Sequence, residues 1–94
     1  MSIKEHAKKE GVNMFINKTN DGRNNICGRK ISELRGCLKI SQRELADRLQ
    51  IAGLDVDKNA IQRMESGKRF ITDIEILAIS KIFNVTPNDL LDIK

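Results

Sequence analysis

Apolar residues recur at helical spacing along most of the chain after residue 26. Cys27, Ile31, Leu34 and Leu38 repeat at i, i+4, i+7 and i+11, which places them on one face of a helix. Further inward stripes are formed by Leu45, Ala46 and Leu49, then Ile61 and Met64, then Ile76, Ile79, Ser80 and Phe83, and finally Leu90 and Leu91. Because no alternating strand pattern interrupts them, the sequence predicts an all-α bundle.

Capping signals divide this pattern into five short helices. Each predicted start after the first has an N-cap residue, and three of these starts also have an acidic residue three positions later, as in a capping box. The starts are marked by Ser41 with Glu44, by Asp57, by Thr72 with Glu75, and by Thr86 with Pro87 and Asp89. The second and third helices are both amphipathic and are joined by a turn, which is the layout of a helix-turn-helix.

The third helix, in the stretch KNAIQRMESGK at residues 58–68, has two sides of different chemistry. At about 100° per residue, one side is apolar and the other carries Lys58, Asn59, Gln62 and Arg63. Gly67 ends the helix, because glycine adopts the left-handed conformation without steric cost. Arg and Lys can pair with guanine, Asn and Gln can pair with adenine, and no acidic residue interrupts this face. The ordinary alternative is a solvated helix surface.

Composition favours an anionic partner. The chain has 94 residues, enough for one domain with a modest core, and Lys and Arg outnumber Asp and Glu by 17 to 13. Its net charge is +4 and its pI is near 9.3. With three Phe and no Tyr or Trp, it lacks the aromatic residues that single-stranded nucleic acids stack on.

Signals for catalysis, metal binding and membranes are missing from the sequence. The cysteines, Cys27 and Cys37, form no CxxC pair, and the single histidine is His6, so no zinc site is predicted. No Ser/His/Asp set or phosphate loop is present, and we expect neither an enzyme nor a cofactor. Without a spanning apolar run or a signal-peptide core, we expect a cytoplasmic protein with reduced, partly buried thiols.

Residues 1–25 differ from the rest and are interpreted as an N-terminal arm or leader. They are polar and rich in Asn and Gly, and we expect this arm to be mobile, with the folded domain at 26–94. Basic arms can enter a DNA groove, which is one interpretation of Lys4, Lys8, Lys9 and Lys18. A tail that only adds solubility is the simpler alternative.

Three segments together resemble the phage-repressor and Cro-like helix-turn-helix family, also called the XRE family. They are GRKISELRGCLKISQRELADRL, AIQRMESGKR and ILAISKIFNVTPNDLL, and the resemblance covers about residues 26–94. It implies a five-helix lambda-repressor-like DNA-binding domain and a transcriptional regulator or repressor that binds operator DNA. The recognition helix, about 58–66, would then lie in the major groove.

The resemblance also implies roles for individual residues. Base edges would be read by Lys58, Asn59, Gln62 and Arg63. Phosphates would be held by Gln42, Arg43, Ser66, Lys68 and Arg69. Arg35 and Glu65 are similar to a buried ion pair that joins the first helix to the third. One departure is the connector before the third helix, which is longer than the usual family turn and carries Asp55 and Asp57.

A second apolar sector on the fourth helix predicts a further contact. Ile74, Leu77, Ala78 and Ile82 lie beside the inward face, and either the Met14-Phe15-Ile16 cluster or a second subunit would cover them. We favour a homodimer, which fits a twofold operator with half-sites about 34 Å apart. The alternative function is a protein-interaction module, such as an antitoxin or adaptor, with incidental DNA binding.

Overall fold

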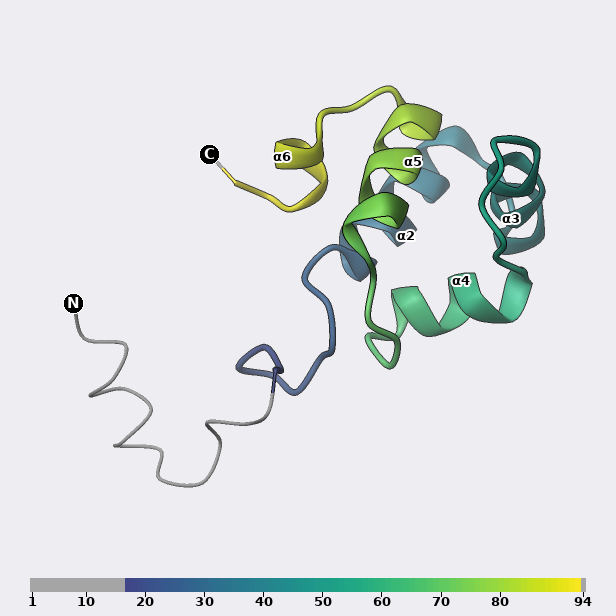
Figure 1. Ribbon diagram of the computed structural model, residues 1–94. Helices are drawn as coiled ribbons and strands as arrows, with labels where there is room; N and C mark the ends of the chain where they lie inside the picture. The colour runs from purple at the N-terminus through teal and green to yellow at the C-terminus, as the bar shows by residue number, and fades with distance from the viewer. Residues whose placement is uncertain (1–16, 94) are drawn as a thin grey trace, which may run out of the picture.

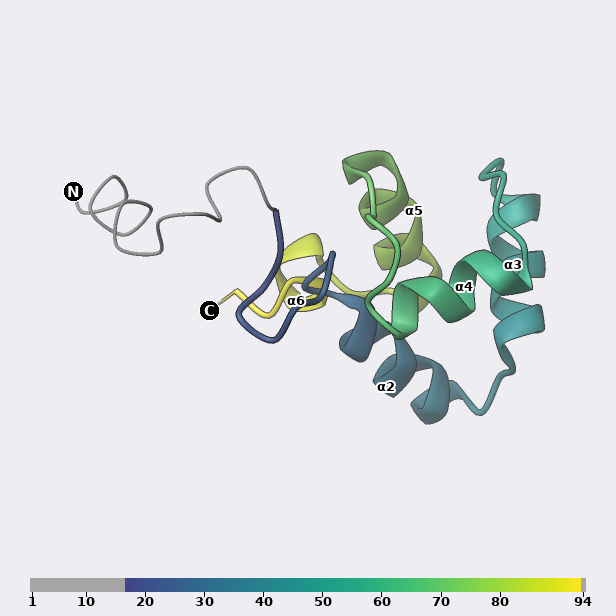
Figure 2. The same ribbon diagram turned by 90° about the horizontal axis from the view of Figure 1, so that it is seen from below.

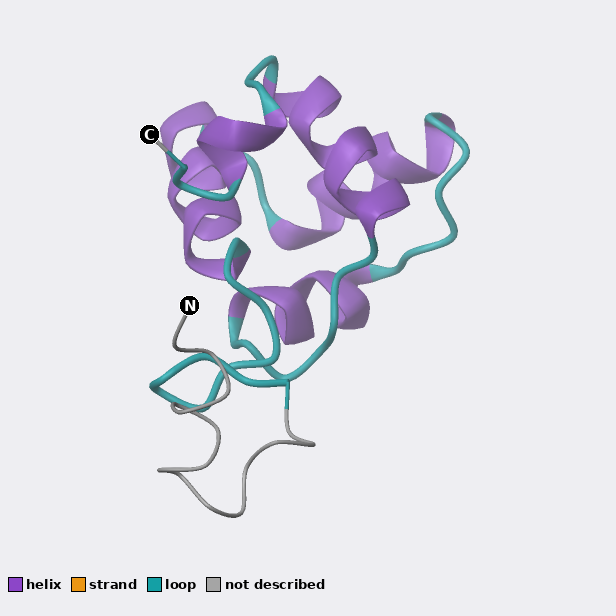
Figure 3. Ribbon diagram, turned by 60° about the vertical axis from the view of Figure 1, so that its left-hand side comes forward, coloured by secondary structure: helices purple, strands orange, loops and turns teal. Residues whose placement is uncertain are grey.

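The computed structural model describes residues 17–93, and these form five helices (Figure 1). The helices are α2 (Gly28–Leu38), α3 (Gln42–Ile51), α4 (Lys58–Glu65), α5 (Asp73–Phe83) and α6 (Pro87–Leu90). No strand occurs within 17–93 (Figure 3), which confirms the predicted all-α architecture. Most of the predicted arm lies outside the described residues, including Met14-Phe15-Ile16, His6 and three of its lysines, Lys4, Lys8 and Lys9.

Four helix pairs enclose a single core. α4 packs against α3 and α2, while α5 packs against α3 and α6. The buried apolar residues come from all five helices and their connectors: Cys27, Ile31, Ile40, Leu45, Ala46, Leu49, Val56, Ile61, Met64, Ile79, Phe83 and Leu90. The inward stripes expected from the sequence are therefore confirmed for α3, α4 and α5.

The predicted N-caps are present at every helix where they were expected. Thr72 and Thr86 each close a full capping box, with Glu75 and Asp89 as the reciprocal partners. The Asp57 carboxylate accepts a hydrogen bond from the Ala60 amide at 2.8 Å, which opens α4. Local sequence signals thus define where these helices begin.

The cap of α3 differs in one detail from the prediction. Ser41 Oγ accepts the Glu44 amide at 3.0 Å, but the Glu44 carboxylate does not reach back to close a box. It instead accepts a hydrogen bond from Arg48 at 2.8 Å. An i,i+4 pair on the exposed face offers Glu44 a charged partner in place of a neutral amide.

The end of α2 corrects a second expectation. Leu38 is 48% exposed and Cys37 is also exposed, although we expected both to be at least partly buried. The reason is that Lys39 takes a left-handed conformation (φ 58°) and turns the chain back toward α2. The Ile40 amide then donates to the Arg35 carbonyl at 3.2 Å, and Ile40 enters the core instead of Leu38.

The connector between α3 and α4, residues 52–57, is anchored near its end by Val56. Val56 is buried, and its carbonyl accepts a hydrogen bond from Gln50 Nε2 at 2.7 Å. Gly53 takes φ +98°, which lets the chain leave α3 sharply. The extra length is therefore accommodated by packing one side chain into the core.

None of the helices within residues 17–93 is long and apolar enough to cross a membrane.

Candidate nucleic-acid interface

One face of α4 carries the four residues expected to read bases. Lys58, Asn59, Gln62 and Arg63 are all exposed, whereas Ile61 and Met64 behind them are fully buried. The four polar side chains make no hydrogen bond to another residue between 17 and 93. α4 lies along the lower side of the domain in Figure 1 and crosses the front of the view from below in Figure 2. A long-armed polar face is thus presented on a rigid helix.

The back of α4 is held by its last residue, Glu65. Its Oε2 accepts a hydrogen bond from Arg35 Nε at 2.8 Å, and its Oε1 accepts from Arg35 Nη2 at 3.1 Å and from Gln42 Nε2 at 3.0 Å. Hydrogen bonds to Glu65 raise the pKa of the Arg35 guanidinium, so this group stays charged. One carboxylate therefore joins α2, α3 and α4.

The five residues expected to meet phosphates differ in how much they are already engaged. Arg43, Ser66 and Lys68 are exposed, and Ser66 Oγ makes only a long hydrogen bond of 3.3 Å to the Arg63 carbonyl. Gln42 is partly buried, and its amide nitrogen is bonded to Glu65. The exposed three are the groups best placed to bind an anion from solution.

Arg69 is held by Glu75 at the start of α5. Its Nη1 and Nη2 donate to the two carboxylate oxygens of Glu75 at 2.9 and 3.0 Å. Burial raises the pKa of Glu75, but the hydrogen bonds from Arg69 and Thr72 outweigh that effect and leave it below its usual value. The bidentate pair fixes the α4–α5 connector to α5, and it occupies nitrogens that a phosphate would need.

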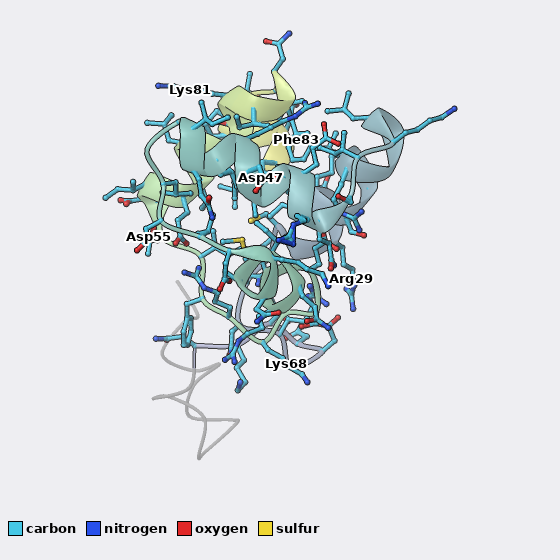
Figure 4. All side chains as sticks on the ribbon, turned by 90° about the vertical axis from the view of Figure 1, so that its right-hand side faces the viewer. Arg29, Asp47, Asp55, Lys68, Lys81 and Phe83 are labelled. Atoms are coloured by element: carbon cyan, nitrogen blue, oxygen red, sulfur yellow. The ribbon has the colours of Figure 1, made fainter. Side chains whose placement is uncertain are left out.

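The acidic connector lies at the side of the domain and not at the edge that carries Lys68. Figure 4 shows Lys68 on the lower edge of the domain and Asp55 on its left-hand side, higher than Lys68. Asp57 is engaged as the N-cap of α4, and with Asp47 it borders a shallow polar groove between α3 and α4. Arg43, Lys58 and Asn59 line the same groove, so basic and acidic groups alternate there.

Neither cysteine is placed for metal chemistry. Burial raises the pKa of the Cys27 thiol, which keeps it protonated, and Cys37 lies on the exposed side of α2. Among residues 17–93, no three His, Cys, Asp or Glu side chains are grouped to hold a metal ion.

A protein-family model described as helix-turn-helix matches residues 31–90. The chain belongs to the helix-turn-helix family, in its phage-repressor and Cro-like branch. That family consists of DNA-binding transcriptional regulators, and this chain shares that general role. No curated protein sequence matches the chain.

A solved structure supports the same assignment for this helix-turn-helix protein. The chain is similar to the P22 c2 repressor protein, crystallised in complex with synthetic operator 9T in the presence of Tl⁺. The TM-score is 0.62 with 27% sequence identity, over 74% of this chain and 98% of the repressor chain. At this identity the similarity supports the family as well as the fold.

Three residues that the sequence did not mark as functional touch the end of α4 and its connector. Arg23, Asn24 and Asn25 were assigned to the arm, but their side chains donate hydrogen bonds to the carbonyls of Glu65, Lys68, Met64 and Arg69. They precede the part of the chain that the family model matches. An Asn three residues before Gly28 is a weak capping signal, and Asn25 Oδ1 does accept the Gly28 amide at 2.8 Å. Nothing local in the sequence indicates its partners near residue 65.

Proposed function

We propose that this protein is a sequence-specific double-stranded DNA-binding regulator whose helix α4 lies in the major groove. The observation that carries the proposal is the exposed set Lys58, Asn59, Gln62 and Arg63 on a helix with a fully buried back. Side chains of these types can make two hydrogen bonds to a purine edge, and an α-helix fits the width of the groove. The helix is held rigidly through Glu65, so its side chains meet the bases in a fixed register.

Contacts to the phosphate backbone would flank α4 on two sides. Arg43 extends from the start of α3, and Ser66 and Lys68 follow the end of α4. Such contacts orient the protein on the duplex and supply affinity that does not depend on sequence. Gln42 and Arg69 support this arrangement by holding Glu65 and Glu75, and in the complex they lie beside the same backbone.

The regulator acts as a homodimer in this proposal. Ile74 and Leu77 on α5 are 69% and 50% exposed, and they line a mainly apolar groove with Ile76, Pro87 and Leu91. Covering this groove with the same groove of a second copy would create a twofold assembly. Two recognition helices then bind two half-sites, and occupancy of the operator in the cytoplasm blocks or recruits RNA polymerase.

Selection of bound duplexes from a random pool tests the function directly. We expect a palindromic consensus with half-sites about one helical turn apart. A matched control is the full-length variant in which Lys58, Asn59, Gln62 and Arg63 are all alanine, which should keep its fold and select no consensus. If the wild-type protein enriches no sequence, and instead captures a protein in a fixed ratio, the interaction-module alternative replaces this one.

A further inference from the structure

We propose that Arg23, Asn24 and Asn25 are positioning residues for DNA recognition, because they fix the end of α4 and the connector that follows it. This inference rests on the proposed function of α4. The three residues are called the N-terminal clasp below. They act through the backbone of α4 and its connector and are not among the proposed DNA contacts.

The clasp supplies donors to carbonyls at the end of α4 and in the connector after it, of which the Met64 carbonyl also accepts the Gly67 amide at 3.1 Å. The last carbonyls of a helix have no amide donors within the helix and need other partners. Asn25 Nδ2 donates to the Met64 carbonyl at 3.0 Å and to the Arg69 carbonyl at 2.8 Å, and Arg23 Nη2 donates to the Glu65 carbonyl at 2.7 Å. The positive charge of Arg23 also lies at the negative end of the helix dipole.

Asn24 holds the part of the connector that lies between Glu65 and Arg69. Its backbone amide donates to the Gly67 carbonyl at 2.7 Å, and its side-chain Nδ2 donates to the Lys68 carbonyl at 3.0 Å. Lys68 is one of the proposed phosphate contacts, so the clasp fixes the backbone from which that side chain extends. Lys18 Nζ in turn donates to Asn24 Oδ1 at 2.7 Å, which brings a second lysine to the same edge.

Two glycines show how closely the clasp fits. A Cβ on Gly67 would lie 2.8 Å from both Cγ and Cζ of Arg23, and Gly67 itself has φ +82°. A Cβ on Gly28 would lie 2.0 Å from the Met64 carbonyl oxygen and 2.7 Å from Asn25 Oδ1. The start of α2 and the end of α4 therefore meet through Asn25 with no space for a methyl group.

A loosened clasp should affect specific binding more than general binding. Direct base contacts depend on the placement of the helix to within about 1 Å, whereas phosphate contacts from long side chains tolerate more movement. The clasp controls the end of α4 that carries Gln62 and Arg63. Its loss should therefore lower the ratio of affinity for the selected operator to affinity for a scrambled duplex.

The first test is Asn25→Asp in the full-length protein. This variant keeps the oxygen that accepts the Gly28 amide and removes both donors to the α4 end. We expect the ratio of specific to scrambled affinity to fall about tenfold or more, measured below the melting transition of the variant. The charge-matched control Asn20→Asp, at an exposed position in the same segment, should lower both affinities alike and keep the ratio.

A double-mutant cycle on Arg23 and Gly67 tests the contact itself. Gly67→Ala should lower the affinity ratio, and Arg23→Ala in the same chain should restore part of it by removing the atoms that the new methyl group meets. Should Asn25→Asp fail to fold, Asn24→Ala is measured in its place, since it removes the side-chain bonds to the Lys68 carbonyl and to Lys18 and keeps the backbone bond to Gly67.

The outcomes separate this inference from the proposed function. If the wild-type protein prefers its operator and the clasp variants keep the full affinity ratio, the clasp does not position α4 and only this inference falls. If the effects of Arg23→Ala and Gly67→Ala on the affinity ratio are additive, the contact between these two residues does not position α4, and again only this inference falls. If the wild-type protein prefers no duplex, the proposed function fails first.

Discussion

Arg35 Nε lies 2.8 Å from Glu65 Oε2, and this ion pair links α2 to the end of α4. The side chain of Glu65 is only 8% exposed and that of Arg35 is 21% exposed, so water screens the pair weakly. Glu65 also accepts a hydrogen bond from Gln42, which adds α3 to the same junction. One carboxylate therefore helps to hold α4 against both α2 and α3.

Glu65→Ala should destabilise the fold by about 3 kcal/mol, because it strands the Arg35 charge in a partly buried site. Urea unfolding followed by circular dichroism measures this loss. The control is Glu44→Ala, which breaks the exposed pair with Arg48 and should cost less than about 1 kcal/mol. Equal effects of the two substitutions would show that Glu65 does not organise the junction.

Arg63→Ala should weaken binding to the preferred operator by about 1–3 kcal/mol and relax specificity at the base pair it reads. Its side chain is exposed, so the fold should be unchanged. Titration of operator and single-base variants by fluorescence anisotropy measures both effects. Lys81→Ala, on the edge of the domain opposite Lys68 in Figure 4, serves as the control and should bind normally. Normal operator binding by Arg63→Ala would exclude its role in reading bases.

Lys68→Ala should weaken binding to all duplexes by a similar factor, in contrast to Arg63→Ala. A phosphate contact releases condensed counterions, so its loss should reduce the slope of log affinity against log salt by about one. Binding measured over a series of salt concentrations gives that slope. An unchanged slope would place Lys68 away from the DNA backbone.

The features of the structure that could be predicted are those that depend on a few neighbouring residues with a recognisable pattern. The two sides of α4 follow from helical geometry, and its start follows from Asp57 three residues before Ala60, so both could be predicted from a short window of sequence. Leu38 also has the right spacing, but the left-handed turn at Lys39 replaces it in the core with Ile40. No glycine marks that turn, so the sequence gives no warning of it.

The hydrogen bonds of Asn24, Asn25 and Arg69 could not be predicted from the sequence for a related reason. Asn24 and Asn25 look like ordinary turn residues, and their bonds reach partners 39 to 44 positions away. Arg69 looks like one more exposed basic residue after α4, yet its guanidinium is paired with Glu75. Composition indicates which groups can bind an anion, but only the tertiary fold shows which of them are already paired.

The Arg69–Glu75 pair predicts a dependence of stability on acid pH. Because the pKa of Glu75 is lowered on folding, the unfolded chain binds its proton first as the pH falls. The pair therefore contributes its full stability above the usual glutamate pKa of about 4.3, and this contribution is lost as the pH drops through the pKa of Glu75 in the folded protein.

The substitution Glu75→Gln tests this dependence, because it keeps an oxygen for the Thr72 amide and removes the titrating group. The stability difference between wild type and variant, measured by urea unfolding, should be largest at neutral pH and shrink below about pH 5. A constant difference down to pH 3 would assign the pair no such role.

Leu77→Asp should convert the protein from dimer to monomer. The side chain is half exposed in the groove formed by α5 and α6, and a carboxylate placed there would be buried against an apolar partner surface. Sedimentation equilibrium should show a dimer for the wild-type chain and a dissociation constant raised at least about tenfold for the variant. Ile51→Asp is the matched control, because Ile51 is 88% exposed and lies outside the groove. Leu77→Asp should also lose affinity for the full palindrome. Its affinity for a single half-site should be unchanged, since the substitution leaves α4 untouched. A wild-type chain that stays monomeric at high concentration would contradict the dimer and leave the groove to a different partner.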